Sequence, residues 1–283
     1  MRIGRRASLL GLTVVAAVGA TPFLLGAGSG QARTRSVALS CGQTVTVSVA
    51  LTADMSCPGS DGLGIGANGI VVNLNGHTIR GDGTHTGVLD SGHTGVVIEN
   101  GTVDGFNYGI LLQPGASGTV QNVRSQTSVI GIDALGNSML ISGDYALGSG
   151  TGILVADGSG AKVIGNWAES SASDGIDVED ATGVSVTGNK ATNNIGSGIV
   201  LFNSTGLVSG NVADGNSNSG IVLNSVGSGV KSALTASNNR ADFNQGDGIL
   251  SSEGGSNDGG GNVVQDNGTA VQCKNIICHE VSN

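Results

Sequence analysis

Carboxylates gather at one place in this sequence, at residues 173–180, which read Ser-Asp-Gly-Ile-Asp-Val-Glu-Asp. Asp177 and Glu179 alternate with aliphatic residues, so both side chains would lie on one face of a strand. Asp133 occupies the matching place in an earlier segment, and two strand spacings would put it roughly 9.6 Å from Asp177. Since an inverting glycosidase needs an acid and a base about 6.5–9.5 Å apart, Asp133, Asp177 and Glu179 are candidate catalytic residues.

The same acidic stretch offers a second chemistry, the binding of a hard cation. Ca²⁺ prefers about six to eight oxygen ligands, and Asp174, Asp177, Glu179 and Asp180 would supply four carboxylates within seven residues. A third interpretation is a solvated acidic patch on an acidic protein. The residues alone leave the catalytic, Ca²⁺-binding and solvated interpretations open.

Two repeating positions indicate which elements carry these carboxylates. A glycine followed by an aliphatic residue recurs at steps of 25, 22, 22, 21, 23, 23, 22 and 28 residues, and an asparagine or aspartate recurs in register with it. The glycines are Gly62, Gly87, Gly109, Gly131, Gly152, Gly175, Gly198, Gly220 and Gly248, and the second series is Asn75, Asn100, Asn122, Asp144, Asn166, Asn189, Asn211 and Asn239. Self-similarity at a fixed period of about 20–50 residues is typical of a solenoid.

Each repeat is strand-like rather than helical. After the glycine come short alternating runs such as Ile153-Leu154-Val155, in which the first and third residues are aliphatic. A second apolar run precedes each asparagine, and a shorter segment follows it. Three short strands in about 22 residues predict an all-β protein, a parallel β-helix of about nine coils. The asparagines would occupy corners in the left-handed backbone conformation and stack in hydrogen-bonded ladders.

The repeat resembles the right-handed parallel β-helix superfamily, which has the pectin-lyase-like fold, over roughly residues 36–270. The opening, CGQTVTVSVALTADMSCPGSDGLGIGANGIVVNLNGHTIRG, is similar to the entry region of secreted actinobacterial β-helix proteins. The resemblance implies a protein that binds or acts on extracellular polysaccharide, as a lyase, hydrolase or epimerase if it is an enzyme. Because one fold hosts many functions, a non-catalytic cell-surface or scaffold protein with an apolar contact face is the alternative.

The residues that enzymes of this superfamily use beside their carboxylates are not evident. A lyase resembling pectate lyase needs an Arg or Lys base, and Lys162 and Lys190 lie beside other strands than the one that carries Asp177. The motifs of polygalacturonases and alginate epimerases are absent, and Trp167 is the only tryptophan, so a long aromatic sugar groove is not expected. The basic candidates within the repeats are Arg124, Lys162, Lys190, Lys231 and Arg240.

The N-terminal segment has the pattern of an export signal peptide. Three arginines, including the pair Arg5-Arg6, precede a mostly apolar stretch, and Gly30-Gln31-Ala32 offers small residues for cleavage. Both general and twin-arginine export are compatible with this pattern, and an uncleaved membrane anchor is the alternative. Cleavage would give a secreted protein without a stable membrane span. The predicted organisation is a signal at 1–32, an N-terminal cap at 33–60, coils at 61–253 and a C-terminal cap at 254–283.

Removing the signal segment would make the protein strongly acidic. It would leave nine basic against 21 acidic residues, a formal net charge of −12. Binding of nucleic acid needs clustered Lys and Arg, so nucleic acid is not expected as a partner. An acidic exported solenoid is either simply soluble or binds cations.

The four cysteines lie at the two ends of the repeats, and an even count in an exported protein favours disulfides. About nine coils at ~4.8 Å each would separate the ends, which leaves the pairs Cys41–Cys57 and Cys273–Cys278. These bridges would fasten the terminal coils, whose strand edges are otherwise unpaired. A metal site of Cys273, Cys278 and His279 is the alternative at the C-terminal end.

The strand after each glycine would also turn aliphatic side chains outward, on the face that enzymes of this superfamily use as a groove. Because large apolar patches on soluble monomers usually mark contacts, we expect this face to be covered. The candidate covers are a loop at 227–234, the segment after Glu253, or a second copy of the chain in a homo-oligomer. The outward residues are Leu89, Leu111, Leu154, Val200, Val222 and Leu250, with Leu135 and Phe202 beside them.

Overall fold

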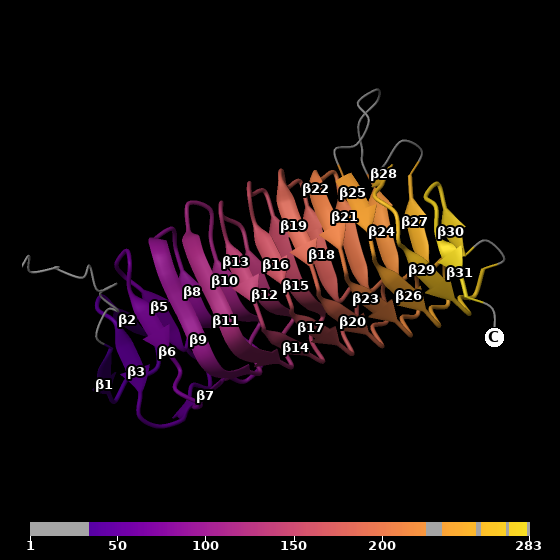
Figure 1. Ribbon diagram of the computed structural model, residues 1–283. Helices are drawn as coiled ribbons and strands as arrows, with labels where there is room; N and C mark the ends of the chain where they lie inside the picture. Colours follow the sequence, from indigo (N-terminus) through magenta and orange to yellow (C-terminus); the bar gives the residue numbers. More distant parts are fainter. Residues whose placement is uncertain (1–33, 225–233, 253–255, 270–271, 282–283) are drawn as a thin grey trace, which may run out of the picture. The chain divides into compact units, whose positions relative to one another are not determined.

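A computed structural model describes residues 34–224, 234–252, 256–269 and 272–281 of the chain. Within these ranges all regular structure is β-strand, and the strands pair in parallel with strands one coil away. They follow one another in chain order along a solenoid of about ten turns, close to the nine predicted (Figure 1). The predicted signal segment and residues 227–233 of the predicted loop lie outside the described residues.

The nine strands at the repeated glycines, with one further strand at each end, form one sheet of eleven strands, here called the first sheet. It consists of β2 (Gln43–Val45), β5 (Leu63–Ile65), β8 (Thr86–Asp90), β10 (Tyr108–Leu112), β12 (Ile130–Ala134), β15 (Thr151–Ala156), β18 (Ile176–Glu179), β21 (Ile199–Phe202), β24 (Ile221–Asn224), β27 (Ile249–Ser251) and β30 (Cys273–Lys274). Equal repeat positions pair with one another, as in Asp133 with Leu154 and Leu154 with Asp177. The predicted outward column is therefore confirmed.

The remaining strands form a sheet of twenty strands that bends at the asparagine corner into a second and a third face. The second face holds β1 (Arg35–Val37), β3 (Val49–Leu51), β6 (Val71–Asn73), β13 (Leu140–Ser142), β16 (Lys162–Ile164), β19 (Val184–Thr187), β22 (Gly206–Ser209), β25 (Leu234–Ser237) and β28 (Asn257–Asp258). The third face holds β4 (Met55–Ser56), β7 (Thr78–Arg80), β14 (Tyr145–Leu147), β17 (Trp167–Glu169), β20 (Lys190–Thr192), β23 (Val212–Asp214), β26 (Arg240–Asp242), β29 (Val263–Gln265) and β31 (His279–Glu280). Two long strands, β9 (Thr94–Asp104) and β11 (Ser117–Gln126), run through the corner and belong to both faces.

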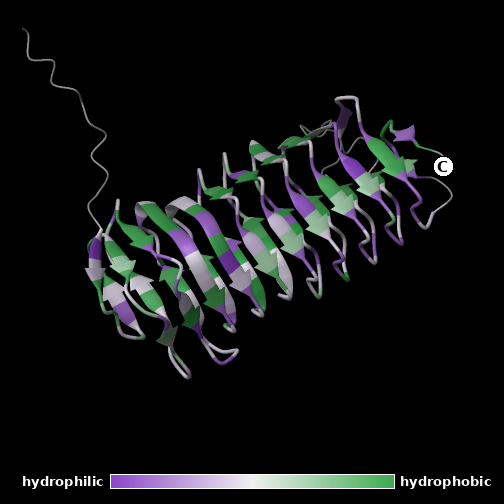
Figure 2. Ribbon diagram, turned by 60° about the horizontal axis from the view of Figure 1, so that its bottom comes forward, coloured by the Kyte–Doolittle hydropathy of each residue, from purple (hydrophilic) through white to green (hydrophobic). Residues whose placement is uncertain are grey.

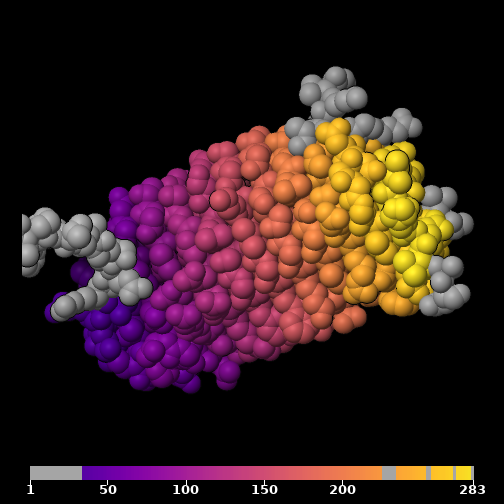
Figure 3. Space-filling view, in the orientation of Figure 1, coloured from indigo at the N-terminus to yellow at the C-terminus, as the bar shows by residue number. Residues whose placement is uncertain are grey.

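The interior is a stack of aliphatic side chains, one set from each coil. Hydrophobic and hydrophilic residues alternate along the strands, as expected when one side of each strand faces a core (Figure 2). The colours of Figure 3 pass steadily from one end of the chain to the other, so each coil contacts mainly its neighbours in sequence. The repeated glycines permit this close stacking, because a Cβ atom at Gly131 would lie only 2.4 Å from the carbonyl oxygen of Gly152.

The two roles expected of the asparagine series are both present, but different members perform them. Asn75, Asn100 and Asn122 adopt the left-handed conformation with φ of 52°, 60° and 53°. From Asp144 onward the preceding residue takes that conformation, as Gly165 does before Asn166. The later asparagines are then buried and stacked, and Nδ2 of Asn166 donates a hydrogen bond to Oδ1 of the asparagine one coil ahead at 3.0 Å.

A second ladder of buried asparagines follows the strands of the third face. It comprises Asn194, Asn216, Asn244 and Asn267. Each Oδ1 accepts a hydrogen bond from the backbone N–H of the residue one coil back, which satisfies corner donors that burial would otherwise leave unpaired. The spacing of 22, 28 and 23 residues is visible in the sequence but was not predicted to form a ladder.

Both predicted disulfides are confirmed. Cys41 is bonded to Cys57 and Cys273 to Cys278, and no free cysteine remains. The alternative of a metal site at Cys273, Cys278 and His279 is therefore wrong, because the two sulfur atoms are oxidised. The terminal strands β1–β4 and β28–β31 continue the same parallel ladders as the coils, while the cap boundaries stay predictions. Across the described parts of the chain, no helix has the length and apolarity needed to cross a membrane.

Candidate functional site

The structure brings Asp177 and Glu179 together on the outer side of β18, as predicted. Both side chains are half-buried. Asp133 lies in the same column on β12, with Leu154 between it and Asp177. The three predicted catalytic residues therefore lie on one sheet, where Asp133, which is only 5% exposed, is two strand spacings from Asp177.

Burial raises the pKa of both aspartates in this column. It raises the pKa of Asp133 to about 6. Burial, followed by the charges of Glu179 and Asp174, raises the pKa of Asp177 to about 7. One carboxyl oxygen of Asp133 and one of Asp177 has no hydrogen-bond partner. A carboxyl group that keeps its proton near neutral pH suits a general acid, so the column offers an acid, and its role in catalysis stays a prediction.

The four carboxylates predicted to bind Ca²⁺ do not all converge. Oδ1 of Asp174 accepts a hydrogen bond from the backbone N–H of Ser197, and Asp180 accepts one from Nδ2 of Asn203, so both are engaged with the next coil. Asp177 and Glu179 remain as a pair on the strand between them. No group of three or more His, Cys, Asp or Glu side chains in the described ranges has the arrangement of a metal site. Ca²⁺ binding stays a prediction that rests on the acidic pair.

The outward aliphatic column is less exposed than its position on the outside of a sheet suggests. Val222 is 8% exposed and Leu154 is half-buried, whereas Phe202 in the neighbouring column is 41% exposed. Residues 227–233 of the predicted loop lie outside the described residues, and the described part of the segment after Glu253 forms β28–β31, which pair with the preceding coils. Covering by a chain segment or by a second copy therefore stays a prediction.

The third face carries an aromatic pair that sequence reasoning missed. Tyr145 and Trp167 pair on adjacent strands, and their ring centroids are 4.8 Å apart in a stacked arrangement. Arg124 lies 4.6 Å above the Tyr145 ring, and Nζ of Lys190 lies 4.2 Å above the Trp167 ring. Trp167 therefore has an aromatic neighbour, which was not predicted from the sequence. Arg124 and Lys190 thus cover the outer faces of the two stacked rings. The stack stabilises the fold and leaves mainly the ring edges for a ligand.

A hollow of about 410 Å³ begins where this stack ends, across strands β17, β20, β23 and β26. Between the long side chains of Lys190 and Arg240, the same column of the third face holds the shorter Val212. The hollow is thus a gap in a row of large side chains, and its volume falls within the range of ligand pockets, about 300–1,000 Å³. Its lining includes Glu169, Lys190, Thr192, Asp214, Arg240 and Phe243.

Ion pairs hold one wall of the hollow. The guanidinium of Arg240 donates to Asp214 through Nη2 and to Asp242 through Nη1, the latter at 2.9 Å. The backbone N–H of Asp242 also donates to Oδ1 of Asp214 at 3.1 Å. Burial raises the pKa of Asp214, against the lowering effects of that N–H and of Arg240 and Lys190. The wall therefore presents fixed donors and acceptors in a half-buried setting.

Phe243, at the rim of the hollow, has a backbone conformation that is unusual for a phenylalanine. From β14 to β29, the residue after each strand of the third face is in the left-handed conformation, and the neighbouring coils place Asn193, Gly215 and Asp266 there. Phe243 adopts φ 59° at this position, although the conformation costs an L-residue roughly 1–2 kcal/mol. Its side chain is 58% exposed, so no core packing compensates for the strain. The signal in the sequence is a phenylalanine at a repeat position that is otherwise small or polar.

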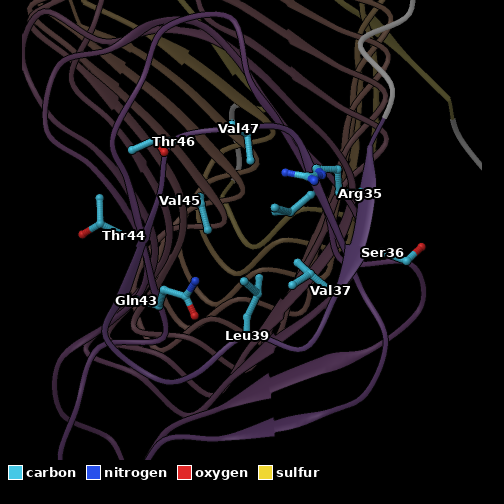
Figure 4. A pocket seen from close by; sticks show the side chains of 10 residues that line it. Arg35, Ser36, Val37, Leu39, Gln43, Thr44, Val45, Thr46 and Val47 are labelled. Carbon is cyan, nitrogen blue, oxygen red and sulfur yellow. The ribbon is translucent and has the colours of Figure 1, made fainter.

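A second cavity, of about 440 Å³, lies at the N-terminal end of the solenoid. Figure 4 shows Val37, Leu39 and Val45 pointing into the opening, while Ser36 and Thr44 point away from it. This cavity is the open end of the apolar interior. Its lining is half aliphatic and half polar, and it contains no carboxylate and no aromatic ring, unlike the hollow on the third face.

Comparisons with known proteins agree with this fold. Residues 68–231, more than half of the chain, match the family described as "Right handed beta helix region". Among solved structures, a mutant of the periplasmic alginate epimerase AlgG is 12% identical, with a TM-score of 0.58 over 86% of this chain and 79% of that one. The surface protein and adhesin PfbA of Streptococcus pneumoniae is 12% identical, with a TM-score of 0.52 over 83% of this chain and 85% of that one.

A third similar structure belongs to a larger protein. The Dettilon tailspike protein is 15% identical, with a TM-score of 0.51 over 80% of this chain, which spans 59% of the tailspike chain. No curated protein sequence matches this chain. At 12 to 15% identity these likenesses show the fold alone.

Proposed function

This chain belongs to the right-handed β-helix family, and from that premise we propose that it is an exported protein that binds polysaccharide in the hollow between β17 and β26. Two disulfides, which form and persist in oxidising compartments, and the signal-like segment at 1–32 support export. The hollow combines an exposed aromatic ring with convergent donors and acceptors, which is the composition of a small-ligand site.

Phe243 is the observation that carries the proposal. A strained backbone persists where function selects it, and an exposed aromatic ring in a strained corner contributes nothing evident to stability. The C–H face of a sugar ring packs well on an aromatic ring, and sugar hydroxyl groups bind carboxylates and guanidinium groups. Phe243, Asp214 and Arg240 together present these three features at one hollow.

Catalysis by the acidic column on the first sheet is the second candidate function. The specific observation in its favour is the pKa of about 7 for Asp177, which suits a general acid in a polysaccharide hydrolase. Asp133 is the candidate partner, because its place two strand spacings from Asp177 in the same column, roughly 9.6 Å, is close to the separation that an inverting hydrolase needs. Binding on the third face and hydrolysis on the first sheet are compatible in one protein, since the two surfaces are formed by different strands.

A polysaccharide panel tests both candidates. We expect Phe243→Ala to weaken binding at least about tenfold, because burial of a phenylalanine ring contributes roughly 1.5–3 kcal/mol and 1.4 kcal/mol is tenfold in affinity. The matched control is Phe202→Ala, an exposed phenylalanine on the first sheet. Equal binding by the parent and by Phe243→Ala would reject the hollow as the site. Release of reducing ends by the parent but not by Asp177→Asn would establish the hydrolase.

A further inference from the structure

The charges of the hollow point to the class of sugar that it takes. Resting on the proposed function, we infer that the ligand is a neutral sugar, held by its hydroxyl groups, and not a uronate or another anionic sugar. The reason is that the two cations of the hollow, Lys190 and Arg240, already interact with other groups of the protein.

Arg240 is not free to bind an anion. It forms ion pairs with both Asp214 and Asp242, so two carboxylates already balance one guanidinium. A sugar carboxylate next to Arg240 would lie beside the negative charges of Asp214 and Asp242, whose side chains are only 19% and 6% exposed, so that their repulsion is weakly screened. Arg240 still has N–H groups beyond the two used in these ion pairs, because a guanidinium carries five. These can donate to neutral hydroxyl groups.

The positive charge of Lys190 does not make the hollow as a whole positive. Its ammonium lies over the Trp167 ring, and its charge acts on the nearby Asp214. Glu169 lines the same hollow and accepts a hydrogen bond from the Tyr145 hydroxyl at 2.5 Å. The two cations therefore face three carboxylates, counting Asp242 behind Arg240. The acidic protein around them, with a formal net charge of −9 for the whole chain, adds to the repulsion of an anion.

A neutral sugar matches what the hollow offers. Its hydroxyl groups can donate to the carboxylates of Glu169 and Asp214 and accept from Lys190 and Arg240. Its apolar ring face can pack on Phe243. Because the lining residues come from four successive strands, the hollow extends along the solenoid axis over about three strand spacings of ~4.8 Å. A short stretch of a sugar chain parallel to the axis fits this shape.

Calorimetric titration of the full protein with neutral and anionic polysaccharides tests the inference. The neutral probes are a β-glucan and a galactomannan, and the anionic probes are polygalacturonate and alginate. We expect a neutral probe to bind at least tenfold more tightly than an anionic one, with an affinity that changes little between about 0.05 and 0.5 M NaCl. Phe243→Ala should weaken this binding at least about tenfold, and Phe202→Ala should leave it unchanged. Glu169→Gln removes one negative charge from the hollow at nearly constant shape. It should strengthen the binding of polygalacturonate and so reduce the difference in affinity between the neutral and the anionic probes.

The outcomes separate the two proposals. Equal or tighter binding of the anionic probes, with the same dependence on Phe243, would overturn the neutral class and leave polysaccharide binding in the hollow standing. Binding of no probe, or binding that ignores Phe243→Ala, would overturn the proposed function as well.

Discussion

Asp144 occupies a position that an asparagine fills in each of the following coils, and replacing it with asparagine should stabilise the protein in a pH-dependent way. Nδ2 of Asn166 donates to the carbonyl of Ile141, and the equivalent carbonyl for residue 144 is that of Val120, which pairs with Ile141. An ionised Asp144 has no proton to donate there. Its Oδ2 is buried without a hydrogen-bond partner, while its Oδ1 accepts from the N–H of Val123.

The magnitude follows from the pKa of Asp144, which burial raises from 3.8 to about 7 against the opposing hydrogen bonds from backbone N–H groups. The folded state then holds a proton that the unfolded state has released, so the stability from this group is complete below about pH 4 and is lost as the pH rises to about 7. At about 1.4 kcal/mol per pKa unit the loss is at most roughly 4 kcal/mol. Asp144→Asn should therefore gain about 2–4 kcal/mol at pH 8 and less than about 1 kcal/mol at pH 4.

Urea unfolding followed by Trp167 fluorescence at a series of pH values measures this difference. Other buried aspartates also titrate, so the quantity of interest is the change in unfolding free energy between the variant and its parent at each pH. Asn166→Asp is the matched control, since it places a carboxyl one coil further along the same ladder and should destabilise more at pH 8 than at pH 4. An Asp144→Asn effect of equal size at pH 4 and pH 8 would refute the reasoning.

Three further predictions concern other sites. Phe243→Asn should raise the unfolding free energy by about 1 kcal/mol, because asparagine tolerates the left-handed corner; a destabilised variant would show that the ring supports the fold. Loss of the Cys41–Cys57 bridge, which joins residues 16 apart, should cost about 3 kcal/mol in urea unfolding, and an unchanged midpoint would contradict this. If the acidic pair of β18 binds Ca²⁺, millimolar Ca²⁺ should raise the melting temperature and Asp177→Asn should abolish the rise, whereas an unchanged melting temperature of the parent would leave a solvated patch.

The repeats made the fold predictable because a solenoid is specified by local periodicity. The glycine series located the strands of the first sheet, and its register placed Asp133, Leu154 and Asp177 in one column. The disulfides followed from the separation of the two ends. The asparagine series was harder to interpret, because Asn122 and Asn166 look alike in sequence while one lies exposed at the corner and the other is buried one position further along.

The hollow could not be predicted in the same way. It arises from contacts between coils: Val212 is short where its neighbours Lys190 and Arg240 are long, and Phe243 stands on a corner reached only after the 28-residue step. Sequence reasoning treated the two cations as candidate bases for a lyase and did not consider their partners. The pairing of Arg240 with Asp214, 26 residues earlier, emerges only when the strands are in register.

The asparagine ladders have a consequence for how the solenoid opens. Each buried Asn binds the coil on either side, since Asn189 donates to the carbonyl of Val163 behind it and to Oδ1 of Asn211 ahead. Separating any two of these coils therefore breaks bonds in both ladders at once, and it exposes side-chain amides along with backbone amides. In native-state hydrogen exchange, the corner amides between Asn166 and Asn244 should therefore exchange through one cooperative opening, with a common opening free energy. The coils near Asn75 and Asn100, whose corner side chains are not buried, should open one at a time from the N-terminal end.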